Sequence, residues 1–389
     1  LAVDHRGIRS VAAGAVAGVV ARWLTDTVRD APAGTVADVA AASPTPAADW
    51  RPVWATLDDR TDDRGEAFVD LATGESVSWS ALARRARAVA GELRRRGLQS
   101  GDRVAVITPP GVDLVAVVYG VWRAGGVTVI ADRGLGLRGL GAALRSARPD
   151  WVVGPRRALV ASRAMRWAPR AVPVDVAALV AASGDDTGLP VPAADDQAAV
   201  LFTSGATGPA KGVRYRHRQL AAQRDALAGL YSIGPNDRLV AAFAPFALYG
   251  PALGIPTALP DCDVTAPSTL TAADLDAACT RVGATLAFAS PAALANVVAT
   301  APSGGRLPGL IGLRLVLSAG APVPSERLAA VGRLAPGAEL RTPYGMTEAL
   351  PIADIDLTGI LAAEADEADG GVCVGRPVPG AEVRVVAVG

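Results

Sequence analysis

The sequence predicts an α/β protein built on parallel strands. Short apolar runs alternate with helix-length segments from Trp50 onward, and strands that alternate with crossover helices form parallel sheets. The chain has 389 residues, 50% of them hydrophobic and 20% charged, so it is long enough to bury a large core. Ser, Gly and Tyr residues follow several of the runs, which predicts a ligand crevice at the carboxyl ends of the strands.

The first helix predicted after Trp50 begins at Ser78 or Ser80 and ends at Arg96. From Leu82 onward its apolar residues recur every three or four positions, while arginines occupy the other face and indicate a solvated surface. Gly97 is expected to close this helix. The segments expected next are a strand at 104–107, a helix at 112–124 and a strand at 127–130.

The rest of the chain continues this alternation. Strands are expected at 198–202, 213–217, 285–289 and 313–317, and helices at 219–230, 271–282 and 291–299. Residues 239–260 carry no charge, which favours a buried strand and helix, and the acidic run 364–369 is interpreted as a solvated loop. Residues 382–388 alternate like a strand.

The chain is divided into residues 1–49, a helix followed by a linker, and residues 50–389, one large domain. A helix is expected at 8–24 and interpreted as the end of a fused upstream domain, such as a hydrolase, before the Pro/Ala-rich linker 31–48. The uncharged run in this helix is shorter than the roughly 20 residues of a membrane span, and no signal-peptide cleavage site follows it. The chain is expected to continue at both ends.

Composition narrows the class of protein. The formal net charge is zero, which argues against a nucleic-acid-binding protein. Cys262, Cys279 and Cys373 lack metal-ligand or disulfide spacing, which fits a reducing cytoplasm. The two histidines, His5 and His217, leave little room for a histidine metal site, and His217 is expected to be structural rather than catalytic.

Residues 203–212, with the sequence TSGATGPAKG, combine hydroxyl groups, glycines and one cation. Backbone N–H groups, hydroxyl donors and an ammonium group together suit the oxygens of a polyphosphate. Lys211 is the only lysine among 38 lysine and arginine residues. A lysine at this position is expected if the loop needs a compact positive charge. The alternative is that a single lysine stands here by chance in an arginine-rich chain. The predicted phosphate-binding residues are Thr203, Ser204, Gly205, Ala206, Thr207, Gly208 and Lys211.

This loop departs from a Walker A sequence and instead resembles the phosphate loop of the adenylate-forming superfamily. LRRRGLQSGDRVAVITPP and GVWRAGGVTVIADRGLG resemble two early motifs of that superfamily, with Arg133 and Leu135 departing from the second. PFALYGPALG, LPDCDVTAP and TPYGMTEALP are similar to segments of OleC-type beta-lactone synthetases, with Met346 replacing an alanine. The resemblance covers residues 50–389.

The resemblance implies the large N-terminal domain of the adenylate-forming fold: two parallel-sheet α/β subdomains and the start of a β-barrel subdomain. It implies ATP and Mg²⁺ as cofactors and Lys211, Thr347 and Glu348 as catalytic residues, with Glu348 as the metal ligand. Further nucleotide-binding residues are Gly320, Ala321, Pro322, Tyr344, Gly345, Met346 and Thr347. The acyl pocket is assigned to Phe246, Leu248, Tyr249, Gly250, Ser290 and Ala319, with Leu248 at a position where related enzymes have histidine.

The implied reaction activates a long-chain 2-alkyl-3-hydroxy fatty acid as an acyl-adenylate. The 3-hydroxyl group then closes a beta-lactone and releases AMP. A fatty-acyl-CoA or acyl-AMP ligase is the alternative, and a non-catalytic nucleotide-binding scaffold is an alternative of another class. The expected partners are the hydroxy acid and pathway enzymes of the thiolase, reductase and hydrolase kinds. The ribose-binding aspartate, the hinge and the C-terminal domain with its lysine are expected beyond Gly389.

Overall fold

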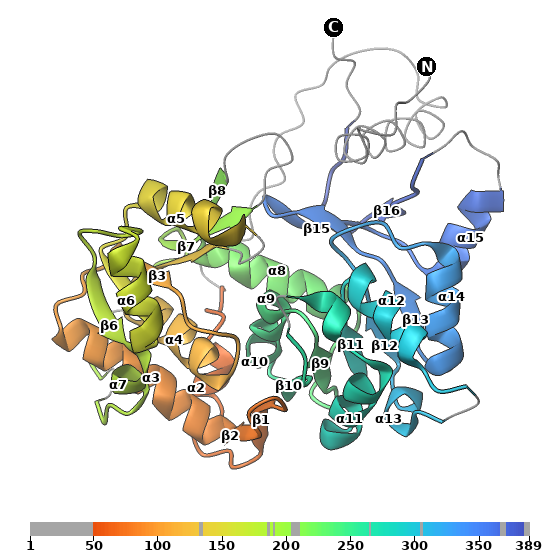
Figure 1. Cartoon of the computed structure of the whole chain (residues 1–389), viewed down its shortest axis with the longest axis horizontal. Coiled ribbons are helices and arrows are strands. Elements are labelled where there is room, and N and C mark those ends of the chain that lie inside the picture. Colours follow the sequence, from red (N-terminus) through yellow and green to blue (C-terminus); the bar gives the residue numbers. More distant parts are fainter. Residues whose placement is uncertain are drawn as a thin grey trace, which may run out of the picture.

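The computed structural model describes residues 50–131, 135–184, 187–189, 191–203, 211–263, 266–303, 306–365 and 371–384, without the side chains of Thr203, Lys211 and Ala244. These residues form two large sheets, the first on the left of Figure 1 and the second at its centre and right. The second sheet also includes the earliest described strands, at residues 66–78.

The first large sheet has six strands in the order β6, β5, β3, β4, β7, β8. Neighbouring strands are parallel except β7 and β8. The strands are β3 (Arg103–Val106), β4 (Val127–Ala131), β5 (Trp151–Gly154), β6 (Val172–Asp175), β7 (Gln197–Thr203) and β8 (Lys211–Arg216).

Helices cover both faces of this sheet. Because side chains alternate along a strand, Val104 and Val106 pack with α3, α4 and α7, whereas Ala105 packs with α5 and α6 on the opposite face. These helices are α3 (Trp79–Arg95), α4 (Val112–Arg123), α5 (Gly136–Ala147), α6 (Arg156–Ala164) and α7 (Val176–Val180).

The second large sheet has seven strands in the order β13, β12, β11, β9, β10, β1, β2, and only β1 and β2 pair antiparallel. The strands are β1 (Glu66–Asp70), β2 (Glu75–Ser78), β9 (Leu239–Ala241), β10 (Thr257–Leu259), β11 (Leu286–Phe288), β12 (Leu315–Leu317) and β13 (Glu339–Arg341). Helices α11 (Ala272–Val282), α12 (Pro291–Thr300) and α14 (Ser325–Leu334) cover its outer face.

Three helices lie between the two sheets. Buried residues of α3, α4 and α8 (His217–Leu230) pack against strands of both sheets and form one hydrophobic cluster, here called the inter-sheet core. Its members include Trp79, Leu82, Tyr119, Ala198, Leu220, Leu227, Leu239 and Phe288. This shared core fixes the edges of the two sheets relative to each other.

A third, antiparallel sheet contains β14 (Tyr344–Met346), β15 (Ala349–Asp354) and β16 (Arg376–Pro377). The predicted fold class is therefore confirmed: two parallel-sheet subdomains are followed by the beginning of an antiparallel one. Short helices complete the described part: α2 (Ala55–Asp58), α9 (Ala244–Ala247), α10 (Tyr249–Leu253), α13 (Pro308–Ile311), α15 (Leu357–Ala365) and the 3-10 helix η2 (Pro267–Thr269).

Local signals account for the helix starts. The hydroxyl of Ser78 accepts a hydrogen bond from the Ala81 N–H at 3.2 Å, so Ser78, rather than Ser80, is the N-cap of α3. Thr271 and Asp274 form a reciprocal capping box at the start of α11.

Four element predictions need correction or lie outside the described residues. The strand expected at 213–217 ends at Arg216, because His217 begins α8. Glu364 lies in α15 rather than in a loop, and residues 366–370 are not described. Residues 382–384 form no strand, while 385–389 are not described. The helix expected at 8–24 also falls outside the described part.

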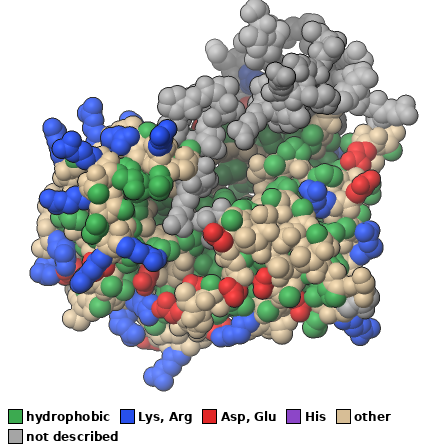
Figure 2. All heavy atoms as spheres, in the orientation of Figure 1, with side chains coloured by type: hydrophobic (Ala, Val, Ile, Leu, Met, Phe, Trp, Pro, Cys, Tyr) green, Lys and Arg blue, Asp and Glu red, His purple; other side chains and the backbone are tan. Residues whose placement is uncertain are grey.

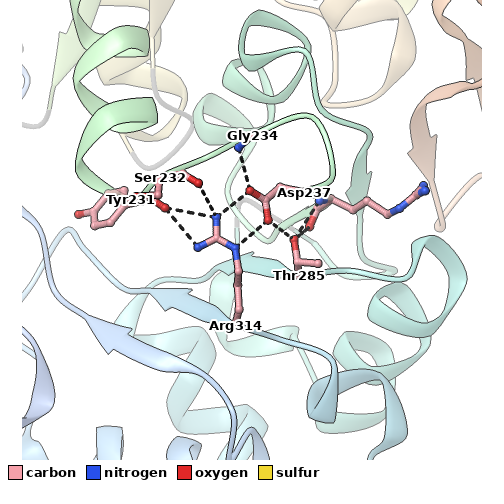
Figure 3. A network of polar contacts seen from close by, with 7 residues as sticks. Tyr231, Ser232, Gly234, Asp237, Thr285 and Arg314 are labelled. Carbon is pink, nitrogen blue, oxygen red and sulfur yellow. Dashed lines mark hydrogen bonds and ion pairs between the residues drawn. The ribbon is translucent and has the colours of Figure 1, made fainter.

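A polar network ties together the amino ends of β9, β11 and β12 (Figure 3). The Arg314 guanidinium donates two hydrogen bonds to the Asp237 carboxylate, at 2.8 and 2.7 Å, and others to the backbone carbonyls of Tyr231 and Ser232. Asp237 also accepts from the Thr285 hydroxyl at 2.7 Å and the Gly234 N–H at 2.9 Å. The network lies at the sheet edge opposite the carboxyl ends, so its role is structural.

Candidate functional site

The predicted phosphate loop connects two antiparallel strands. Thr203 of β7 pairs with Lys211 of β8, so a hairpin replaces the strand-loop-helix arrangement of a Walker A site, as the sequence indicated. The side chains of Thr203 and Lys211 are not described, and Ser204, Gly205, Ala206, Thr207 and Gly208 lie outside the described residues. Their phosphate-binding role stays a prediction.

Four neighbouring parallel strands end at one edge of the second sheet. β13, β12, β11 and β9 are adjacent in that order, and the segments that follow them begin at Thr342, Ser318, Ala289 and Ala242. In open α/β sheets ligands bind in the crevice outside such carboxyl ends. The structure thus brings three groups of predicted site residues, at Ser290, Ala319 and Tyr344, to a common edge.

The turn after β12 offers an open backbone surface. Gly320 has φ +99°, a conformation that favours glycine, and a Cβ atom built on it would meet no atom within 4 Å. The Ser318 hydroxyl is buried without a hydrogen-bond partner among the described residues. Ala321 and Pro322 are exposed beside this turn. Such a turn leaves room for a flat ring next to the backbone, as the adenine assignment requires.

Thr347 and Glu348 form the two-residue turn of the β14–β15 hairpin, in which Met346 pairs with Ala349. The Glu348 side chain is exposed, and Tyr344 is partly buried. A Cβ atom on Gly345 would lie 2.8 Å from the Ala349 carbonyl oxygen, so glycine is needed at this point of the hairpin. The hairpin therefore presents Glu348 to solvent at a tightly packed turn.

Tyr215 connects this turn to the strand that begins with Lys211. Its hydroxyl donates a hydrogen bond to the Thr347 carbonyl and accepts one from the Gln223 amide at 3.1 Å. Burial raises the pKa of the Tyr215 hydroxyl, the nearby Glu348 carboxylate raises it further, and the hydrogen bond from Gln223 opposes both. The phenol therefore stays protonated and remains a donor to Thr347.

Aromatic side chains line the adjacent part of the inter-sheet core. The Phe246 and Phe288 rings stack with centroids 4.2 Å apart, and Phe243 stacks on Phe288 at 5.6 Å. Phe246, Leu248, Tyr249 and Ala319, four of the predicted pocket residues, all pack against the inter-sheet core. The structure thus groups these four on one apolar surface.

The other two predicted pocket residues have structural contacts of their own. The Ser290 hydroxyl caps α12 by accepting from the Ala293 N–H at 3.2 Å. A Cβ atom on Gly250 would lie 1.6 Å from the Thr257 hydroxyl oxygen, so glycine lets α10 pack on β10. Direct contact of either residue with an acyl chain stays a prediction.

The Tyr249 hydroxyl points to α8 and donates a hydrogen bond to the Gln223 side-chain oxygen. The Gln223 amide in turn donates to Tyr215, so a continuous chain of hydrogen bonds runs from Tyr249 to the Thr347 carbonyl. On the backbone side, the Leu248 carbonyl accepts from Tyr119 of α4 at 2.7 Å. These contacts fix the apolar surface relative to the turn that carries Glu348.

Sequence reasoning missed Tyr215, Gln223, Phe243 and Phe288. Two of them could have been found from their positions. Tyr215 lies on the same strand as Lys211, four residues later, and Phe288 is the last residue of β11, at the edge where ligands are expected. Gln223 had none, because a glutamine within an amphipathic helix resembles any solvated residue.

His217 is buried next to the Trp54 ring, with centroids 5.4 Å apart in an edge-on arrangement. Burial lowers the pKa of its imidazole to about 4, although the charge of Asp196 partly opposes this shift. Its Nδ1 atom has no hydrogen-bond partner among the described residues. These contacts give the neutral imidazole a packing role.

The described residues contain no group of three or more His, Cys, Asp or Glu side chains placed to hold a metal ion. Glu348 is nevertheless an exposed, hard oxygen donor at a fixed turn. Mg²⁺ keeps several water ligands and is commonly bound by one or two carboxylates together with substrate phosphates. A single exposed carboxylate therefore fits Mg²⁺ that arrives with a nucleotide.

The chain matches the family described as AMP-binding enzyme over residues 58–389. It therefore belongs to that family. In the described part, no helix is both long and apolar enough to cross a membrane.

Two relatives are named olefin beta-lactone synthetase. The chain is 38% identical to the protein from Xanthomonas campestris over 328 residues and 36% identical to that from Stenotrophomonas maltophilia over 330 residues. Each match covers 80% of this chain but only 58% of the relative. The ATP-bound MatB structure from Rhodopseudomonas palustris is similar in fold, with TM-score 0.69, 23% identity, and coverage of 85% of this chain and 65% of that chain.

Proposed function

We propose that the protein containing this chain activates a carboxylic acid with ATP and then closes a beta-lactone. The acid's carboxylate attacks the α-phosphorus, the bond from that phosphorus to the bridging oxygen breaks, and pyrophosphate leaves. In the acyl-adenylate, the acid's 3-hydroxyl oxygen attacks the carbonyl carbon, its proton is released, and AMP departs. A nucleophile in the same molecule gains effective molarity and needs no CoA site.

The observation that carries this proposal is the hydrogen bond from Tyr215 to Thr347. It holds the Thr347–Glu348 turn against the strand that begins at Lys211, so two segments far apart in sequence meet. Lys211 and the loop N–H groups would neutralise the departing pyrophosphate, and the Thr347 hydroxyl would donate to the α-phosphate. Glu348 would hold Mg²⁺, which supplies further charge neutralisation. Tyr344 and the turn from Gly320 to Pro322 would enclose the adenine.

The substrate is a long-chain 2-alkyl-3-hydroxy fatty acid. Support comes from the apolar surface at Phe246 and Phe288, because hydrocarbon chains bind to apolar, aromatic walls. The similarity to the olefin beta-lactone synthetases supports the lactone product. Enzymes of the thiolase, reductase and hydrolase classes would supply the acid and consume the product.

Residues 50–389 would form the incomplete large domain, after an N-terminal helix and linker at 1–49. Cys262, Cys279 and Cys373 are free thiols, which is compatible with a cytoplasmic location.

Mass spectrometry of the full-length protein's products tests the proposal. ATP and a racemic 2-alkyl-3-hydroxy acid should give a beta-lactone without CoA, whereas the matching acid without the 3-hydroxyl should stop at the adenylate. Thioester formation from the deoxy acid with CoA, at a rate equal to or above that of lactone formation, would favour an acyl-CoA ligase. Failure to form any adenylate would favour a nucleotide-binding scaffold.

A further inference from the structure

Helices α5 and α6 form one layer on the outer face of the first sheet. Leu144 of α5 and Leu159 of α6 belong to the same hydrophobic cluster above that sheet. The two helices are joined by Trp167, which follows α6: a Cβ atom on Gly141 of α5 would lie 2.5 Å from its ring. The outward surfaces of α5, α6 and the segment to residue 171 are here called the α5–α6 face.

The α5–α6 face is strongly basic within a chain of zero formal net charge. Residues 136–171 contain eight arginines and one acidic residue, Asp150. All eight arginine side chains are exposed. Arg156 pairs with Asp175 at 2.7 Å, and the other arginines of the face form no ion pair within the part of the chain that the structure describes. Their positive charge is therefore available to an external partner.

Large apolar side chains are exposed among these arginines. Val160 of α6 is 68% exposed, Leu137 of α5 is 62% exposed, and Met165 is 44% exposed. Val160 lies four residues after Arg156 and three before Arg163, so the three side chains share one face of the helix. In Figure 2 basic side chains gather at the upper left, where Figure 1 places α5 and α6, with hydrophobic side chains between them.

We propose that the α5–α6 face binds the surface of a membrane that contains anionic phospholipids. The arginines contact headgroup phosphates, while Leu137, Val160 and Met165 enter the boundary between headgroups and acyl chains. A solvated arginine surface would need no exposed apolar residues, and a site for a soluble polyanion would gain nothing from them. Charge and apolar exposure together therefore select a lipid surface. This inference does not depend on the proposed reaction.

Vesicle flotation tests the inference with the full-length protein. In about 0.1 M salt, where the screening length is about 10 Å, the protein should float with phosphatidylcholine vesicles that contain phosphatidylglycerol and much less with pure phosphatidylcholine. Replacing both Arg157 and Arg163 by Gln should weaken partitioning about 30-fold, from about 1 kcal/mol for each arginine near an anionic surface. Val160→Ser should weaken it further, because it removes an inserted apolar group.

Matched changes on the other large subdomain serve as controls. Arg306 and Arg333 are exposed there, and Ile311 is 50% exposed, so Arg306→Gln with Arg333→Gln and Ile311→Ser should leave partitioning unchanged. The inference is overturned if the protein does not float, if it binds neutral vesicles equally well, or if the controls weaken binding as much as the test variants. It is also overturned if a soluble polyphosphate binds this face as tightly as the vesicles and Val160→Ser has no effect.

Discussion

The hydroxyl of Tyr215 donates a hydrogen bond to the backbone carbonyl of Thr347, although the two residues are 132 positions apart. Tyr215 belongs to β8 of the first sheet, and Thr347 lies in the hairpin turn of the third sheet. A contact to a backbone carbonyl constrains the turn whatever side chains the turn carries. The position of Glu348 therefore depends on a tyrosine from another subdomain.

Tyr215→Phe should lower the kcat/KM of adenylate formation about fivefold, because one hydrogen bond of about 1 kcal/mol to the turn is lost. The melting temperature should fall by no more than a few degrees, since the phenyl ring keeps the packing of Tyr215 in the inter-sheet core. ATP–pyrophosphate exchange by the full-length protein measures the effect.

The matched control is Tyr231→Phe, which removes another buried hydroxyl, one bonded to Asp354 at 3.1 Å. It should alter stability more than the exchange rate. If Tyr215→Phe leaves kcat/KM unchanged, or lowers it only in proportion to a loss of folded protein, Tyr215 does not position the turn.

Much of the fold could be predicted from the sequence because its signals are local. The spacing of Leu82, Ala86 and Val89 predicted α3, and the apolar run before Thr203 predicted β7. The sequence also predicted which turns follow the strands of the second sheet. The pairing of Tyr249, Gln223 and Tyr215 was not predictable, because it joins side chains from three elements through contacts that leave no periodic pattern.

Boundaries were less accurate where two signals compete. His217 continues the apparent strand of β8, yet the Arg216 N–H donates to the Gln219 side chain, so β8 ends one residue before the predicted 217 and α8 begins at His217 rather than at 219. Residues 239–260 are uniformly uncharged, so composition alone did not separate α9 from α10. The residues of the predicted phosphate loop were chosen because their side chains and backbone suit phosphate oxygens. Residues 204–210 are not described, so the structure does not test this choice.

Lys211 should be protected by MgATP from an amine-reactive reagent, because the proposed function places its ammonium group among the phosphates. It is the only lysine of this sequence, so peptide mapping of residues 203–217 can follow one side chain without interference from others in the chain. Labelling should fall several-fold at saturating MgATP. Magnesium without nucleotide is the control, and equal labelling in both samples would place Lys211 outside the site.

Glu348→Gln should reduce the stabilisation of the protein by MgATP, because an amide is a weaker and uncharged ligand for a hard cation. The melting temperature without nucleotide should change by less than the equivalent of about 0.5 kcal/mol, since Glu348 is exposed. Thermal shift with and without MgATP measures both effects. The exposed Glu382 provides a control, Glu382→Gln, that should change neither value. A large loss of nucleotide-free stability would instead show that Glu348 supports the hairpin.

Asp237→Asn should destabilise the second sheet, because the Asp237 carboxylate accepts hydrogen bonds from Arg314, Thr285 and the Gly234 N–H (Figure 3). Burial alone would raise the pKa of Asp237, but the hydrogen bonds from Arg314, Gly234 and Thr285 outweigh it and hold the pKa below the usual value of 3.8. At neutral pH the substitution should cost about 2 kcal/mol of unfolding free energy, since charge-assisted hydrogen bonds are lost.

The sign of the pH dependence follows from this lowered pKa. The unfolded chain takes up a proton on Asp237 near pH 3.8, before the folded protein does, so the carboxylate's contribution is complete above that pH and is lost as the pH falls below it. The stability difference between the wild type and Asp237→Asn should therefore be constant from pH 7 to about pH 5 and shrink at lower pH. Urea unfolding across this range measures it, with Asp62→Asn at an exposed position as the control. A difference that stayed constant down to pH 3 would show that the charge of Asp237 contributes nothing beyond the geometry of its hydrogen bonds.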